Sequence, residues 1–167
     1  ADYYYVNKSS LPKVYGGFNT SLSWKGFDLS AIFAYSIGGY IYNRDVTMIL
    51  HNGSLEGRDW STEILRRWTP DNRYTDVPAL STTSNNWNSA STRFLQNNSY
   101  MRLKNLTLSY NLPKQWISKL SLSSVQVYVQ GDNLFTIHRN QGLDPEQGIT
   151  GITYYRYPAM RTISGGI

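Results

Sequence analysis

The chain contains no cysteine and only two histidines among its 167 residues. Without cysteine it has no disulfide framework. His51 and His138 lie far apart in the sequence, so a structural zinc site lacks the ligands that it needs. We therefore expect no metal and no cofactor.

Long apolar runs are also missing. No stretch of about 18 apolar residues is present, which excludes a membrane-spanning helix. The first residues carry neither a basic segment nor an apolar segment of the secretory type. Residues 3–5 resemble the middle of a sequence, and residues 164–167 end inside an expected strand, so we expect the chain to be a fragment of a longer protein.

Charged residues make up only 16% of the chain, although the formal net charge is +5. A soluble domain usually carries about a quarter charged residues. The basic residues do not cluster, and the densest groups are Arg66 with Arg67 and Arg102 with Lys104. Because nucleic-acid binding needs basic residues gathered on one face, we expect no nucleic-acid partner.

Aromatic residues, in contrast, are abundant at 14%, with 14 tyrosines and 5 tryptophans. Amphipathic rings suit a boundary between an apolar and an aqueous phase, such as a membrane interface. Rings near expected strand ends, including Tyr15, Trp24, Phe27 and Tyr110, are predicted to form such an interfacial girdle. A carbohydrate-binding surface would show a similar excess, so composition leaves both alternatives open.

Side chains alternate between apolar and polar with a period of two over unusually long segments. Phe18, Leu22 and Trp24 alternate with Asn19 and Ser23, and the pattern resumes after a short turn at residues 25–26. Such alternation predicts strands with one apolar and one polar face. The strands are expected at residues 15–24, 27–38, 99–112, 124–136 and, with weaker alternation and Pro158 inside it, 154–167.

The length of these segments and of their connections favours an antiparallel transmembrane β-barrel. Soluble strands average about five or six residues, whereas tilted membrane strands need about nine to eleven. The connections alternate between short and long, as in bacterial barrels with short periplasmic turns and long outer loops. One short helix, capped by Asp59 and ending near Trp68, is expected inside the longest loop, before Pro70.

No constellation for catalysis is present, so we expect no enzyme. The G-x-S-x-G nucleophile motif is absent, and no motif places a carboxylate beside either histidine. Asp144 and Glu146 are interpreted as ordinary acidic residues of a turn. Outer-loop residues that could contact a substrate or a partner protein are Arg44, Trp60, Trp68, Trp87, Arg139 and Tyr155.

Five stretches together resemble the C-terminal part of the SusC/RagA family of TonB-dependent outer-membrane transporters. They contain the sequences PKVYGGFN, WKGFDLS, SYMRLKNLTLSYNLP, VYVQGDNLFT and GLDPE, at residues 12–19, 24–30, 99–113, 127–136 and 142–146. Their order and spacing cover nearly the whole chain.

The resemblance implies the rest of a transport machine. Family members are barrels of about 22 strands with a plug inside. A TonB-contacting segment precedes the plug, and a SusD-like surface lipoprotein delivers an oligosaccharide or a peptide to the barrel. Residues 1–167 would then supply about five final strands and their outer loops, without the plug or the TonB segment, in the bacterial outer membrane.

Two alternatives remain open at the level of sequence. A soluble β-sandwich that binds carbohydrate would show short strands packed face to face. A passive porin would share the barrel wall but would not couple transport to energy.

Overall fold

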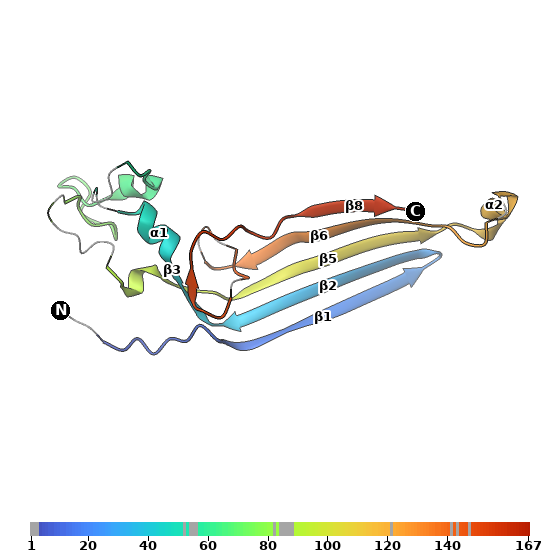
Figure 1. Ribbon diagram of the computed structural model, residues 1–167, viewed down its shortest axis with the longest axis horizontal. Coiled ribbons are helices and arrows are strands. Elements are labelled where there is room, and N and C mark those ends of the chain that lie inside the picture. The colour runs from blue at the N-terminus through green and yellow to red at the C-terminus, as the bar shows by residue number, and fades with distance from the viewer. Residues whose placement is uncertain are drawn as a thin grey trace.

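The computed structural model describes residues 4–51, 53, 57–81, 83, 89–120, 122–140, 142, 144–146 and 148–167. Five strands form one antiparallel sheet in the order β1-β2-β5-β6-β8 (Figure 1). The strands are β1 (Pro12–Trp24), β2 (Phe27–Gly38), β5 (Tyr100–Asn111), β6 (Gln126–His138) and β8 (Thr162–Gly166). The predicted strand content is therefore confirmed, and the first four strands lie close to their expected positions.

The hairpin of β1 and β2 has the predicted two-residue turn. Trp24 pairs with Phe27, which leaves Lys25 and Gly26 as the turn. Both turn residues have positive φ, at 48° and 89°. Two consecutive residues in this conformation match the type I′ turn, whose twist fits the twist of antiparallel strands.

One face of the sheet is apolar across all of its central strands. Phe18 of β1 stacks on Phe33 of β2, with ring centroids 4.7 Å apart. Farther along, Leu29 pairs with Leu108, and Leu108 pairs with Val129. Leu29, Leu108 and Val129 all remain exposed, so no layer of described residues covers this apolar face.

The predicted girdle is present in part. Trp24 pairs with Phe27, and Phe27 pairs with Tyr110, whose ring centroid lies 4.4 Å away. These three rings form an aromatic row on the apolar face at the turn end of the sheet. Tyr15, however, pairs with Ser36 and so lies on the opposite, polar face. Its assignment to the girdle was wrong, because strand parity and not nearness to a strand end decides the face.

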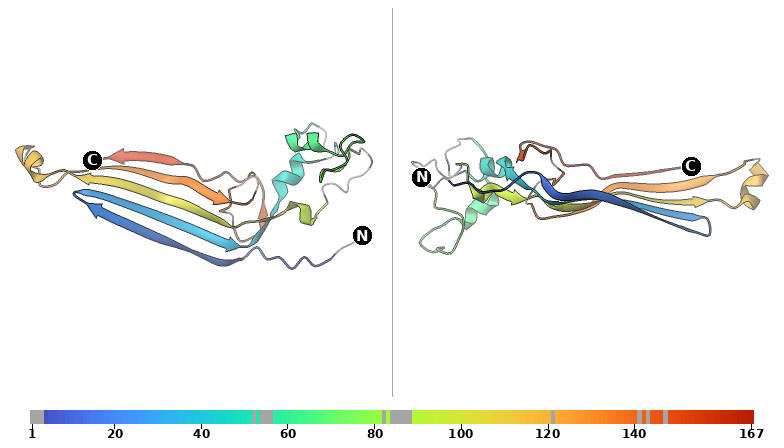
Figure 2. Two further views of the ribbon diagram at one scale, coloured as in Figure 1. Left: turned by 180° about the vertical axis from the view of Figure 1, so that it is seen from behind. Right: turned by 90° about the horizontal axis from the view of Figure 1, so that it is seen from below.

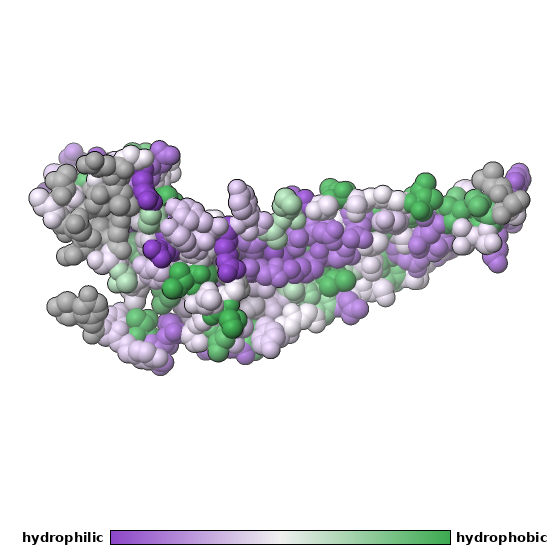
Figure 3. All heavy atoms as spheres, viewed as in Figure 1, coloured by the Kyte–Doolittle hydropathy of each residue, from purple (hydrophilic) through white to green (hydrophobic). Residues whose placement is uncertain are grey.

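The opposite face carries hydrogen-bonded polar side chains. Asp28 accepts hydrogen bonds from Ser23 and Asn111, and thereby joins three strands. Asn105 of β5 donates to Asp132 of β6 at 2.8 Å. In Figure 3 hydrophilic residues form a band along the strands on the face in view. The two faces therefore differ in polarity as the alternation predicted.

A bulge interrupts the regular pairing of β5. The register shifts at Lys104 against β2, and again between Leu103 and Asn105 against β6. Opposite it, Asn133 has a positive φ of 51°. A Cβ on Gly131 would lie only 2.6 Å from Leu134 Cδ2, so glycine is required where that side chain crosses the strand. The bulge keeps Arg102 and Asn105 on the same polar face although three positions separate them.

The sheet is a single layer (Figure 2). A soluble β-sandwich would pack a second sheet against the apolar face, about 10 Å away. No such layer exists among the described residues, and the second sheet lies beyond the ends of the strands. The structure therefore contradicts the β-sandwich alternative.

A small loop module occupies the end of the sheet away from the β1–β2 turn (Figure 1). It contains a three-stranded sheet of β3 (Tyr40–Asn43), β4 (Leu95–Asn97) and β7 (Ile152–Thr153), with β3 in the centre. Its helical segments are α1 (Arg44–Ile49) and the 3-10 helices η1 (Thr62–Arg66) and η3 (Thr92–Phe94). Buried Ile41, Leu50, Ile64, Val77 and Phe94 form its core.

Two sequence predictions require correction here. The single helix expected from Asp59 to Trp68 is a 3-10 helix of five residues, which Ser61 caps through its side chain. Of its expected apolar stripe, Ile64 is buried but Leu65 is exposed. The fifth strand was expected at residues 154–167, yet β8 begins only at Thr162. Pro158 lies before β8. Proline has no backbone N–H to donate to the hydrogen bonds between strands, so its place outside the strand is expected.

The opposite end of the sheet carries the short connections. Besides the β1–β2 turn, it carries the connection from β5 to β6, with α2 (Lys114–Ile117) and η4 (Ser118–Leu120). Figure 1 shows α2 and the loop module at opposite ends of the strands. The expected alternation of short and long connections is thus present in space. No helix in the described part of the chain is long and apolar enough to span a membrane.

Candidate functional site at the loop end of the sheet

Arg44 and Tyr155, two of the six predicted contact residues, lie close together. Asn43 caps α1 by accepting a hydrogen bond from Val46 N–H, which places Arg44 at the first turn. The Arg44 guanidinium lies 4.6 Å from the centre of the Tyr154 ring. The backbone N–H of Tyr155 donates to Asp45 Oδ1 at 3.1 Å. The first turn of α1 and the segment after β7 therefore form one surface.

Trp60 is held by a buried histidine. Its indole Nε1 donates a 3.0 Å hydrogen bond to Nδ1 of His51, whose side chain is almost fully buried. An accepting Nδ1 requires a neutral ring with its proton on Nε2. Part of the Trp60 ring remains exposed. Trp60 thus has a structural contact as well as an accessible surface.

Trp68 lies two residues after η1. Its backbone N–H donates to the carbonyl of Val77 at 2.7 Å, which orders the chain after η1, and its ring is partly exposed. Trp87, the remaining predicted tryptophan, lies outside the described residues. No ring contact joins Trp60 to Trp68 in the described part of the chain.

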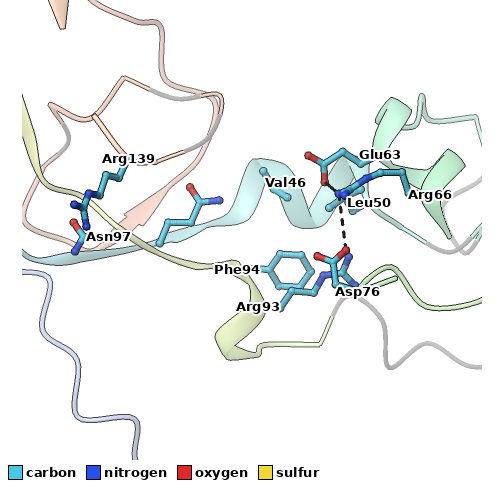
Figure 4. A pocket seen from close by; sticks show the side chains of 10 residues that line it. Val46, Leu50, Glu63, Arg66, Asp76, Arg93, Phe94, Asn97 and Arg139 are labelled. Atoms are coloured by element: carbon cyan, nitrogen blue, oxygen red, sulfur yellow. Dashed lines mark ion pairs between the residues drawn. The ribbon is translucent and has the colours of Figure 1, made fainter. Parts of the chain in front are cut away.

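Arg139 lines a cavity of about 320 Å³ between the loop module and the end of β6 (Figure 4). Arg66 of η1 and Arg93 of η3 also line it, together with the carboxylates of Glu63 and Asp76. Arg66 lies 3.7 Å from Glu63 and 3.9 Å from Asp76. The volume is at the lower end of the range for small-molecule sites, about 300–1,000 Å³.

An ion-pair cluster lies where the polar face of the sheet meets the outer loops. Arg102 of β5 donates through Nη2 to Asp144 at 2.5 Å, through Nη1 to Glu146 at 2.8 Å and through Nε to Thr136 at 2.9 Å. Lys104 Nζ donates to the same Glu146 at 2.6 Å. The Arg102 side chain is only 3% exposed and that of Asp144 only 7%. This cluster fastens the loop after β6 to the sheet.

The carboxyl group of Asp144 is held in its ionised form. Its burial raises the pKa, but the hydrogen bonds outweigh that effect. The backbone N–H of Ala159, the guanidinium of Arg102 and the backbone N–H of Glu146 all donate to it. The pKa of Asp144 therefore lies below its ordinary value.

This cluster was not predicted from the sequence. In the sequence alone, Arg102 and Lys104 form only a basic pair, and Asp144 and Glu146 resemble ordinary turn residues. A signal was present, since by strict alternation Arg102 and Lys104 would fall on the apolar face of the predicted strand, together with Leu106 and Leu108. Finding their partners required the fold, because 42 residues separate Arg102 from Asp144.

Among the described residues, no three histidine, cysteine, aspartate or glutamate side chains gather as a metal site. No described group therefore suggests a metal-dependent reaction centre. What the loop end offers is a set of guanidinium groups, exposed rings and several cavities, which are features of binding.

Comparison with known proteins relates the chain to large outer-membrane receptors. No protein-family model matches it. TonB-dependent receptor P3 of Formosa agariphila is 34% identical over 162 residues, covering 90% of this chain and 16% of that protein. TonB-dependent receptor SusC of Bacteroides thetaiotaomicron is 27% identical over 164 residues, covering 98% of this chain and 16% of SusC.

Comparison with solved structures points to the same group of receptors. A chain of the RagAB peptide importer in its closed-closed state superposes with a TM-score of 0.82 at 34% identity, covering 96% of this chain and 17% of that chain. Its open-open state gives the same values.

The chain thus spans about a sixth of the length of its relatives. TonB-dependent receptors are transporters of the bacterial outer membrane, which confirms the predicted localisation and the prediction that the chain is not an enzyme. The chain is homologous to SusC/RagA-type TonB-dependent receptors over about 17% of their length.

Proposed function

We propose that residues 1–167 form the C-terminal part of the β-barrel of a TonB-dependent importer. The five-stranded sheet would be part of the barrel wall, as about five final strands of about 22. The loop module would lie at the outer surface, and α2 would lie on the periplasmic side. This orientation follows from the rule that bacterial barrels have long outer loops and short periplasmic turns.

The observation that carries the proposal is the uncovered apolar face of long strands. A strand of 13 residues such as β1 extends about 43 Å at about 3.3 Å per residue. With a tilt of about 45°, it rises about 30 Å, which is the thickness of the hydrocarbon layer. In water such a face would be an aggregation surface, whereas lipid would cover it without cost.

The outer loops are the proposed contact region for substrate and partner. The candidates remain Arg44, Trp60, Trp68, Trp87, Arg139 and Tyr155. Arg139 is supported by its position on the cavity, and Tyr155 by its exposure beside α1. Trp60 also stabilises the module through His51, so its substitution would affect folding as well as binding.

The proposed partners are those of the family. A SusD-like lipoprotein would cover the outer mouth, and the solved relative is a complex named RagAB. TonB would couple import to energy through a part of the importer outside these residues. The substrate would be an oligosaccharide or a peptide; the solved relative is described as a peptide importer.

Energy coupling separates this proposal from a passive porin. The full-length protein would be produced in an outer membrane that lacks other importers for the tested oligomers. Uptake of labelled oligopeptides and oligosaccharides would be measured with and without TonB. We expect uptake of at least one class to require TonB. Uptake that continues unchanged without TonB would instead support a porin.

A further inference from the structure

The cavity at the loop end has two guanidinium groups that the described residues leave weakly engaged. Arg66 faces Glu63 and Asp76 at 3.7 Å and 3.9 Å, which is too long for hydrogen bonds. Its side chain is 60% exposed. Arg139 is exposed and makes no ion pair with any described residue. Both side chains therefore have donors available to a ligand.

The third guanidinium group of the cavity, that of Arg93, lies in a different environment. Arg93 lies over the ring of Phe94, 5.7 Å from its centre. Phe94 and Leu50 are buried and line the cavity with apolar surface. Figure 4 shows Arg139 and Arg66 separated in that view, with Phe94 between them. The cavity thus has Arg139 and Arg66 toward its ends and, between them, the apolar surface of Phe94 with Arg93 beside it.

We propose that Arg66 and Arg139 bind carboxylate groups of the imported oligomer, an inference that rests on the proposed import function. The planar guanidinium fork matches a carboxylate with two parallel hydrogen bonds. The carboxylate is either that of an oligopeptide or that of a uronate unit in an acidic oligosaccharide. The apolar surface of Phe94 accommodates the uncharged part between two such groups.

Neutral oligosaccharides are a poorer match for this cavity. Proteins bind uncharged sugar rings by stacking them on exposed aromatic rings, and here Trp60 and Trp68 are absent from the lining. Phe94, the aromatic residue among the lining side chains, is almost fully buried. The cavity offers a ligand the guanidinium donors of Arg66, Arg93 and Arg139, with the carboxylates of Glu63 and Asp76 beside Arg66.

The test is binding to the purified full-length importer, measured by calorimetry with matched pairs of probes. One pair is an alanine hexapeptide and its C-terminal amide. The other pair is a galacturonate oligomer and a neutral galactose oligomer of equal length. We expect the carboxylate member of one pair to bind about tenfold more tightly, the effect of one charge-assisted contact. The pair that shows this preference identifies the source of the carboxylate.

Variants assign the preference to the cavity. Arg139→Gln and Arg66→Gln remove the guanidinium and keep much of the side-chain length, and each is expected to reduce the preference to less than twofold. Arg67→Gln is the matched control, because Arg67 follows Arg66 in the chain but does not line the cavity. Arg139→Lys keeps the charge without the fork and should retain part of the preference. Native-like heat-modifiable migration in gels verifies that every variant is folded.

The outcomes separate this inference from the import function. Equal binding of both members in both pairs would overturn the carboxylate site, and so would a preference that survives both Arg→Gln substitutions. Neither result concerns energy coupling, which is measured as TonB-dependent uptake by the wild-type protein. Uptake that does not require TonB, together with an intact carboxylate preference, would overturn the import function alone.

Discussion

Arg102 and Asp144 form an ion pair of 2.5 Å that joins β5 to the loop after β6, 42 residues farther along the chain. The Asp144 carboxylate also accepts hydrogen bonds from the backbone N–H groups of Glu146 and Ala159. One carboxylate therefore holds both arms of residues 139–161 against the polar face of the sheet. This loop is fixed to the wall near its base, and it also carries the exposed ring of Tyr155.

The first prediction concerns the loss of this ion pair. Asp144→Asn would remove one of the two carboxylates that pair with the buried guanidinium of Arg102, and would leave Glu146 as the other. Removal of one partner from a buried pair typically costs about 3–5 kcal/mol. We expect residues 139–161 of the full-length protein to lose protection from hydrogen exchange, while β1 and β2 keep theirs.

Asp71→Asn is the control for this prediction, because Asp71 is exposed in the loop module. It should leave exchange unchanged. Unaltered protection of residues 139–161 in Asp144→Asn would contradict an anchoring role for the pair.

The second prediction is the pH dependence of the same anchor. Because the folded-state pKa of Asp144 is lowered, its ionised form stabilises the fold above the unfolded-state value of about 3.9. That stabilisation is lost as the pH falls through the lower folded-state value. Protection of residues 139–161 should therefore be equal at pH 7 and pH 5 and should decrease only below about pH 4. In Asp144→Asn this decrease should be much smaller, and a loss in the wild type between pH 7 and pH 5 would contradict the assignment.

The four long strands could be predicted from sequence because each alternates between apolar and polar side chains over a large part of its twelve or thirteen residues. The strands of the loop module could not. β3, β4 and β7 have four, three and two residues, too few for a period to be visible. Helix α1 has six residues and depends on the Asn43 cap and on packing within the module.

The candidate site was predicted only in part for a related reason. Their residue types indicated that Arg44, Arg139 and Tyr155 could contact a substrate or a partner protein. The structure places them on or beside exposed surfaces of the loop module. Which of them share a surface depends on contacts between distant segments. The bulge at Lys104 adds to this difficulty, because it shifts strand parity and places Arg102 on the polar face.

The third prediction tests which face of β1 meets lipid. Phe18 stacks on Phe33 on the apolar face, whereas the next residue, Asn19, pairs with Ile32 on the polar face. An arginine on the lipid face near mid-membrane costs about 2–4 kcal/mol. Phe18→Arg should therefore reduce the amount of heat-modifiable, folded barrel in the outer membrane severalfold. Asn19→Arg, one residue away, should be tolerated.

Equal effects of the two substitutions would show that β1 does not separate lipid from an aqueous interior. The reverse result, with Asn19→Arg the more harmful, would invert the assignment of the two faces.

The last prediction concerns which end of the sheet faces outward. The chain contributes no cysteine, so a thiol introduced here can be labelled without interference from other residues of this segment. Asp71 is exposed in the loop module, and Ser118 is exposed in the connection that carries α2, at the opposite end of the strands. In intact cells a membrane-impermeant maleimide should label Asp71→Cys, and it should label Ser118→Cys only after the outer membrane is permeabilised. Since the long loops of bacterial barrels lie outside, the opposite labelling pattern would place the cavity of Arg66 and Arg139 in the periplasm, where it could not receive an external ligand.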